Sequence, residues 1–366
     1  MTDATARTRS PLRLGSNRIN RFYRGGALLE RFRGASAPSD GDRPEDWVGS
    51  VTKPWGSPAG TGLSALEDGT PLVDLLRDDP VGLLGAEAAA RNPTTTGLLV
   101  KLLDSAIRLP IHCHPTRAFA GRVLGSSFGK AEAWIVLATR RIPGEPAPRV
   151  GIGFRDGVTR SQLHRWIEGQ DAAAMLAALD TTEVAAGDVV FVPPGRPHAI
   201  GAGVFMVEVQ EPTDFSIVTE IAGFPIDADD ASLGLGWDTT LDAIDRAPLA
   251  GGIASLLRRS PEAGAGGPLH RTQLLPPEAA PFFRAERIRV DGRAPFPHDD
   301  GCSVLVAASG AGRLIGPAGT TDLTAGDTLF VPAAAAAALE IEGRALALIA
   351  CRPPRPELLP GAPSPR

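Results

Sequence analysis

Short apolar runs separated by glycine and proline make up most of the chain. Residues 97–103, 133–137 and 188–192 are three examples. Runs of this length between turn residues are typical of strands. Two longer stretches, at about 71–91 and 161–179, are predicted to be helical instead. The pattern therefore predicts a mainly β protein with helical insertions.

A weak internal repeat indicates that the chain contains two related units. The sequence VAAGDVVFVPP at 184–194 is echoed by LTAGDTLFVPA at 323–333. Both copies read as a turn at Gly-Asp followed by a strand that ends at proline. We interpret the repeat as two β-barrels joined by a linker at 263–268, which contains only alanine, glycine and proline.

The two units differ directly after the repeat. The first continues with Gly195-Arg196-Pro197-His198, whereas the second has six alanines at 333–338. Alanine offers no metal ligand, so the second barrel is predicted to be degenerate and to bind no metal. A further helix is expected within 241–258. The predicted segments are a disordered tail (1–12), a metal-binding domain with the two helical insertions (13–222), a helical connector and linker (223–267), the degenerate barrel (268–353) and a second tail (354–366).

Three of the six histidines fall in two short motifs. His112 and His114 are two residues apart, so in a strand both side chains lie on one face. His198 ends the motif Gly187-x5-Pro193-x-Gly195-x2-His198, in which the glycines and the proline make turns that return the histidine to the barrel interior. The two motifs together resemble the signature of the cupin superfamily. An isolated histidine is more commonly a strand cap or a core residue, but this combined spacing favours a metal site.

A carboxylate ligand is expected to complete this site. No acidic residue lies within 116–128, and Glu132 opens the next predicted strand. Three imidazoles and one carboxylate suit Zn²⁺, and they suit Fe²⁺, Mn²⁺, Co²⁺ or Ni²⁺ equally well. We therefore predict one divalent metal ion per chain. Three histidines follow no such pattern and are assigned no role: His164, His270 and His298.

Composition excludes several other classes of protein. The 37 basic and 42 acidic residues give a net charge of −5, which argues against a nucleic-acid binder because phosphate binding needs a basic surface. The three cysteines are far apart in sequence and imply no disulfide framework. We expect no secretion signal and no membrane span, and therefore a cytoplasmic protein.

Four segments, in order, resemble the type I mannose-6-phosphate isomerases over about Asn17 to Arg352. They are LVKLLD at 99–104, IHCHP at 111–115, GKAEAW at 129–134 and VPPGRPHAIGAG at 192–203, followed by VEVQ at 207–210. The resemblance implies two cupin (jelly-roll) β-barrels with a helical insertion. It implies zinc ligation by His114, Glu132 and His198. The family's usual fourth ligand is glutamine, and this chain has His112 at that position.

The resemblance implies the conversion of mannose 6-phosphate to fructose 6-phosphate through an enediol. This reaction needs a general base and a cation beside the developing oxyanion. Lys130 and Glu208 match family positions that line the site and are our catalytic candidates. Val218 stands where the family has arginine. That change leaves two alternatives: an isomerase of another or an unphosphorylated sugar, and a cupin that binds a sugar without turnover.

Overall fold

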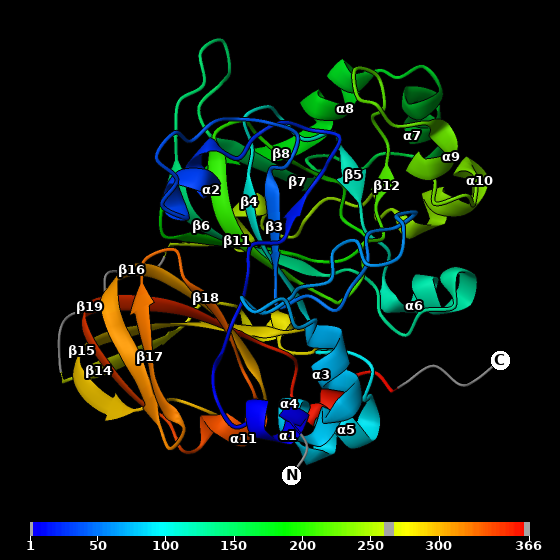
Figure 1. The fold of residues 1–366 in the computed structure, drawn as a ribbon. Coiled ribbons are helices and arrows are strands. Elements are labelled where there is room, and N and C mark those ends of the chain that lie inside the picture. The colour runs from blue at the N-terminus through cyan, green and yellow to red at the C-terminus, as the bar shows by residue number, and fades with distance from the viewer. Residues whose placement is uncertain (1–2, 260–266, 362–366) are drawn as a thin grey trace.

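The computed structural model describes residues 3–259 and 267–361. Within these ranges the strands form three antiparallel sheets, of seven, five and seven strands. Two of the sheets face each other to form the first unit, and the third curls into the second unit, which lies below the first in Figure 1. The predicted mainly β fold class with helical insertions is confirmed.

The first unit is a barrel whose strands lie between Arg18 and Arg259. Its five-stranded sheet has the order β12 (Ile217–Val218), β5 (His112–Cys113), β10 (His198–Ile200), β7 (Arg149–Phe154) and β8 (Leu179–Glu183). Its seven-stranded sheet has the order β13 (Leu257–Arg259), β9 (Asp188–Val192), β6 (Glu132–Thr139), β11 (Val204–Gln210), β4 (Leu99–Asp104), β3 (Glu45–Val48) and β2 (Arg18–Ile19).

The second unit is built on one sheet. Its order is β1 (Leu12–Arg13), β18 (Thr328–Val331), β16 (Ser303–Gly316), β19 (Glu340–Arg352), β15 (Arg284–Pro295) and β14 (Leu269–Gln273), with β17 (Gly319–Thr324) paired to β16. Its alanine run at 333–338 contains the short helix α11 (Ala333–Ala336).

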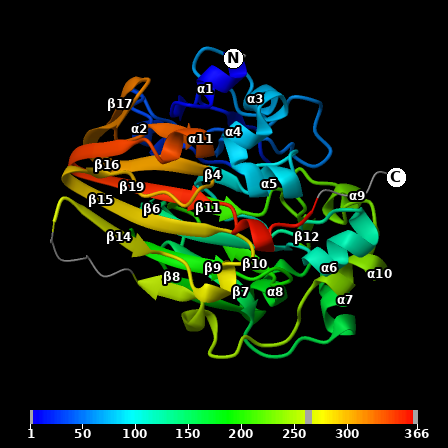
Figure 2. The same cartoon turned by 90° about the horizontal axis from the view of Figure 1, so that it is seen from below.

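Alternation along the strands separates the interior of each barrel from its outer face. In β9, Val190 packs inside the first barrel, whereas Val189 packs outside it. The outer face of the seven-stranded sheet packs against the second unit through one shared core, which includes Val207 and Phe330 (Figure 2). Burial of this apolar face is the main physical reason for the two units to stay together.

Helices cover the outer faces. The helices α7 (Arg160–Glu168) and α8 (Ala172–Ala178) pack on the five-stranded sheet through Leu163 and Met175. The helices α3 (Leu72–Asp78), α4 (Pro80–Leu84) and α5 (Ala86–Arg91) lie near α11 and the second unit in Figure 1. The other helical elements are short: α1 (Asp3–Arg7), α2 (Ala27–Phe32), α6 (Arg117–Phe119), η1 (Ala120–Leu124), α9 (Ala228–Ala231), α10 (Trp237–Thr240), η2 (Leu241–Ala243), η3 (Ile253–Ser255), η4 (Pro277–Ala279) and η5 (Pro356–Leu358).

Two predictions differ from the structure, namely the disordered tail at 1–12 and the helix within 241–258. Residues 1–12 are not a disordered tail throughout, because α1 is helical and Leu12 of β1 pairs with Phe330. Burial of Thr8 and Leu12 explains this order. The helix expected within 241–258 is replaced by the 3₁₀ turns η2 and η3 and by β13, which pairs with β9 and so completes the first barrel's sheet.

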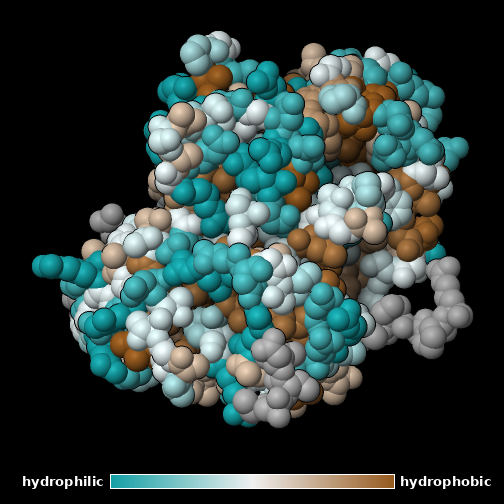
Figure 3. Space-filling model, in the orientation of Figure 1, coloured by the Kyte–Doolittle hydropathy of each residue, from teal (hydrophilic) through white to brown (hydrophobic). Residues whose placement is uncertain are grey.

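The C-terminal segment differs from the prediction in the part that the structure describes, and most of the predicted linker lies outside the described residues. Leu359 is buried against the shared core, so residues 354–361 are not a free tail. Residues 362–366, and the linker residues 263–266, lie outside the described residues. Among the helices in the described ranges, none combines the length and apolar character that crossing a membrane requires. On the face in Figure 3, hydrophilic residues cover most of the surface and hydrophobic ones form small patches, several of them between the two units.

Candidate metal centre

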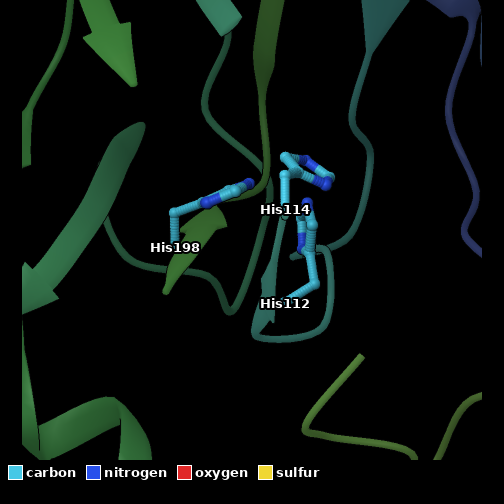
Figure 4. Close-up of side chains that lie close together, drawn as sticks. All are labelled: His112, His114 and His198. Atoms are coloured by element: carbon cyan, nitrogen blue, oxygen red, sulfur yellow. The ribbon is translucent and has the colours of Figure 1, made fainter. Parts of the chain in front are cut away.

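Three imidazole rings converge inside the first barrel. His112 on β5 and His198 on β10 are register partners, and their ring centroids are 4.2 Å apart. His114 follows β5 directly, with its ring 5.0 Å from that of His112 and 4.8 Å from that of His198. One ring nitrogen from each histidine lies within 4.8 Å of the others, and the rings turn toward one another in Figure 4. The three rings could hold a metal ion.

A glycine turn brings the two histidine motifs together. Gly195 has a φ of +88°, a conformation that glycine adopts without steric cost, and its N–H donates to the carbonyl of His114 at 2.7 Å. The turn then leads into β10, whose first residue is His198. The Pro-x-Gly-x2-His motif therefore forms a bend that is hydrogen-bonded to the His-x-His motif and places His198 beside it.

Backbone carbonyls orient all three rings in the same way. The Nδ1 atoms of His112, His114 and His198 lie 2.8 Å from the carbonyl oxygens of Pro110, Phe215 and Arg196, respectively. A carbonyl oxygen only accepts, so each Nδ1 carries the proton and each Nε2 presents a lone pair. Metal-binding histidines typically donate their second ring N–H to a carbonyl or carboxylate oxygen in this way.

The electrostatics of the cluster favour neutral imidazoles. Burial lowers the pKa of His112, and the neighbouring rings of His198 and His114 lower it further. Burial also lowers the pKa of His114 and brings that of His198 to about 3. Within the described residues, the buried Nε2 of His198 has no hydrogen-bond partner. A buried lone pair without a donor is unfavourable, and a cation placed there would satisfy it.

Glu132 adds a carboxylate to the cluster. Its Oε1 lies 2.9 Å from Nε2 of His114 and its Oε2 lies 3.8 Å from Nε2 of His198. Burial alone would raise its pKa, but His114 and the ammonium of Lys130 hold the pKa well below its usual range. Three neutral nitrogens and one carboxylate oxygen are a ligand set that fits a divalent metal ion.

Lys130 contacts ligand atoms of two members of this set. Its Nζ lies 2.5 Å from Oε1 of Glu132 and donates to Nε2 of His114 at 2.9 Å. Lys130 follows Gly129, where a Cβ atom would meet the carbonyl oxygen of Pro115 at 2.5 Å, so this close approach of the two segments requires glycine. Since one lone pair cannot serve two partners, a metal bound at His114 would compete with Lys130.

Glu208 lies on the same inner wall as Glu132. Its strand β11 lies between β4 and β6, and its register partners on these strands are Lys101 and Trp134, respectively. The Lys101 ammonium is 3.2 Å from Oε2 of Glu208, and the Trp134 indole donates to Oε1 at 3.2 Å. Burial, with a further contribution from Glu132, raises the pKa of Glu208 to about 7. A carboxyl group with this pKa can gain and lose a proton near neutral pH.

The sequence did not reveal the buried charges around Glu208. Lys101 also lies 3.7 Å from Glu45 and 3.7 Å from Asp214, and Arg21 is 3.1 Å from Glu45 and 3.3 Å from Asp214. A lysine within an apolar strand was an available signal for Lys101. The other three residues come from segments far apart in sequence, and no spacing rule connects them.

Val218 lies beside the cluster but contributes no charge. Its register partner on β5 is His112, and the valine side chain is buried. Cross-strand partners share a face of the sheet, so the position where the resembling family has arginine is next to the predicted ligands. Three histidines lie outside the cluster: His164 pairs with Glu168 on α7, His270 is on β14, and His298 lies 3.9 Å from Asp300.

Curated proteins similar to this chain are mannose-6-phosphate isomerases. The enzyme of Streptococcus mutans is 28% identical over 206 residues, which are 56% of this chain and 58% of that protein. A probable mannose-6-phosphate isomerase of Bacillus subtilis is 24% identical over 237 residues, 64% of this chain and 69% of that protein. The first match therefore spans less than two thirds of its relative's length. No family model matches the chain.

Solved structures with the same fold carry similar descriptions. The mannose 6-phosphate isomerase of Bacillus subtilis aligns with a TM-score of 0.73 and 21% identity, over 94% of this chain and 99% of that one. A phosphomannose isomerase variant of Salmonella typhimurium aligns with a TM-score of 0.70 and 15% identity, over 94% and 99%. At these identities the structures establish the fold, and the curated relatives support the resemblance to type I mannose-6-phosphate isomerases.

Proposed function

We propose that this chain, which is similar in sequence and fold to the type I mannose-6-phosphate isomerases, interconverts an aldose phosphate and a ketose phosphate. The observation that carries the proposal is the pairing of a His₃–Glu ligand set with Glu208, a carboxyl group of raised pKa, on one inner wall. A site that only binds sugar has little need for both a metal and a base. Mannose 6-phosphate is the proposed substrate and fructose 6-phosphate the proposed product.

In this proposal His112, His114, Glu132 and His198 hold one divalent metal ion, of which Zn²⁺ is our first choice. The metal would supply Lewis-acid stabilisation of the negative charge that develops on the substrate oxygen. The carbonyl partners of the three Nδ1 atoms fix the rings, so the ligands need little rearrangement.

Glu208 is the proposed base that moves the proton between C2 and C1. Its carboxylate form accepts the C2 proton, and the carboxylic acid then returns the proton to C1. Its raised pKa suits both steps because the two forms have similar free energies near pH 7. Lys101 and Trp134 hold the carboxyl group in place through contacts at 3.2 Å.

Lys130 is the second proposed catalytic residue. Its ammonium is buried beside Glu132 and His114, so it places a positive charge next to the ligand set. This charge could stabilise an oxyanion intermediate in a site from which most water is excluded.

The proposal is tested by incubating metal-loaded protein with mannose 6-phosphate and measuring fructose 6-phosphate. Turnover that disappears with a chelator and returns with metal is expected. Turnover of unphosphorylated sugars alone would instead support the first alternative, and tight binding without turnover would support the sugar-binding module. Elemental analysis of the purified protein tests the metal and its identity, and a protein without stoichiometric metal would contradict the ligand assignment.

We also propose the division into a metal-binding domain at 13–222, a connector at 223–267 and a metal-free barrel at 268–353. Two strands cross these boundaries, because β1 joins the sheet of the second unit and β13 joins a sheet of the first unit. The alanine run in place of a histidine motif supports the metal-free assignment. All three cysteines are buried and unpaired, which supports a reducing, cytoplasmic setting.

A further inference from the structure

A cavity of about 390 Å³ is linked to the metal cluster and its surroundings through two of its wall residues. Four loop segments line it: residues 51–55, 92–95, 125–128 and 212–215. Two of its wall residues also support the site. The carbonyl of Phe215 accepts the bond from Nδ1 of His114, and Asp214 lies 3.7 Å from Lys101. The volume is within the range of small-molecule sites.

The side chains available in this cavity are mainly hydrogen-bond donors. Within the described residues, Lys53, the Trp55 indole N–H and the Ser127 hydroxyl have no hydrogen-bond or ion-pair partner. The hydroxyls of Thr94 and Ser126 are already bonded, to Asn92 and to the carbonyl of Phe128. A ligand for this cavity should therefore be rich in acceptors.

The charge of the cavity leads to the same conclusion. Of its lining residues only Lys53 and Asp214 are charged, and Asp214 is compensated by Arg21 and Lys101. The exposed Lys53 ammonium is thus the one lining cation that no described carboxylate neutralises. Phosphate oxygens accept strong charge-assisted bonds from such a donor.

An aromatic surface stands beside this cation. The Trp55 side chain is 45% exposed, although tryptophan is usually well buried, and it packs edge-on against Phe215 with ring centroids 5.4 Å apart. The face of an indole ring packs well on the C–H face of a sugar. A sugar ring against Trp55 and an anion on Lys53 would use both exposed groups together.

We infer that this cavity binds the phosphate-bearing end of the substrate, with Lys53 as the anion-recognising residue and Trp55 as the sugar platform. The inference rests on the proposed function. It resolves the difficulty posed by Val218, because the positive charge missing beside His112 is supplied from the loop at 51–55. Lys53 is then a specificity-determining residue that separates phosphorylated from free sugars.

The experiment compares zinc-loaded wild type, Lys53→Met and Arg77→Met with mannose 6-phosphate and with free mannose. Arg77 is an exposed cation on α3, outside the cavity, and serves as the matched control. We expect Lys53→Met to raise KM for mannose 6-phosphate by about tenfold to a hundredfold, since a hydrogen bond to a charged group is lost. Its kcat and its KM for free mannose should not change, and Arg77→Met should match wild type. Trp55→Ala should raise KM for both sugars.

Other outcomes separate failure of the inference from failure of the proposed function. An unchanged KM in Lys53→Met, or wild-type turnover of free mannose only, would contradict the phosphate subsite but leave the isomerase function intact. Turnover of neither sugar would contradict the isomerase function. In that case calorimetry with mannose 6-phosphate decides the subsite: binding lost in Lys53→Met supports it, and no binding by wild type overturns it.

Discussion

His112 and His198 lie directly opposite each other on neighbouring antiparallel strands, with ring centroids 4.2 Å apart. Two protonated imidazoles at this separation would repel each other, and burial makes each charge more costly still. The pair is therefore suited to neutral rings that share a cation. Val218 is the register partner of His112 on the other side of β5, and it adds no charge next to the pair.

Removal of one ring should abolish metal binding. His198→Ala deletes the proposed ligand whose buried Nε2 has no hydrogen-bond partner among the described residues, and we expect metal content to fall from one equivalent to near zero. Activity on mannose 6-phosphate should fall with it. His164→Ala, which removes a histidine that pairs with Glu168 on α7, is the control and should keep both properties. Full metal content in His198→Ala would contradict the ligand assignment.

Loss of the proposed base should affect turnover but not metal binding. Glu208→Gln keeps the shape of the side chain and removes its ability to accept a proton, so kcat should fall by about 10²- to 10⁴-fold. Metal content should stay at one equivalent because Glu208 is not one of the proposed ligands. The exposed Glu168 provides the control Glu168→Gln, with wild-type kinetics. A fall in kcat of less than about tenfold would assign Glu208 a structural role only.

The pH profile should depend on Lys101. Proton abstraction needs the carboxylate form of Glu208, so kcat/KM should fall as the pH drops through the pKa of this group. Without a bound metal that pKa is about 7, and a bound dication would lower it. The Lys101 ammonium also lowers the pKa of Glu208. Lys101→Met should therefore move the acidic limb of the profile to higher pH, whereas an unmoved limb would show that another group titrates.

Lys130 should weaken metal binding while it assists catalysis. Its ammonium donates to Nε2 of His114, the atom that a metal would use, and adds positive charge beside the site. Lys130→Met should bind zinc more tightly, by about tenfold for each 1.4 kcal/mol of repulsion removed, and should turn over more slowly. Competition with a chromophoric chelator gives the affinity. Weaker zinc binding in this variant would show that Lys130 organises the ligands instead.

Acid should destabilise the metal-free protein through the histidine cluster. The pKa of His198 is about 3 in the fold and about 6.5 in an unfolded chain, so between about pH 3 and pH 6.5 it is mainly the unfolded state that binds this proton. The free energy of unfolding must then fall as the pH falls, by about 2 kcal/mol for this group between pH 6.5 and 4.5.

Urea unfolding at several pH values measures this effect. His198→Gln should have a flatter dependence on pH than wild type over the same interval. His298→Gln, which changes a histidine outside the cluster near Asp300, should have the wild-type slope. Parallel curves for wild type and His198→Gln would mean that His198 is protonated in the folded state.

Local patterns in the sequence were sufficient for the fold class and for the three histidines. Alternating and apolar runs predict strands because side chains on a strand alternate between faces, and that rule placed His112 inside the barrel with Cys113 outside it. The Gly-x5-Pro-x-Gly-x2-His motif is also local, since Gly195 needs its positive φ wherever the turn occurs. The tail predicted at 1–12 failed because order there depends on pairing with β18, more than 300 residues away along the chain.

By itself the sequence thus determined a mainly β fold, a cluster of three histidines and the candidates Lys130, Glu132 and Glu208. Only the tertiary structure decided the environment of those groups. The carbonyl of Phe215 on His114, the contact of Lys101 with Glu208 and the loop that carries Lys53 all join residues distant in sequence. Protonation depends on burial and on charges a few ångströms away, and these distances are set when the sheets close into a barrel.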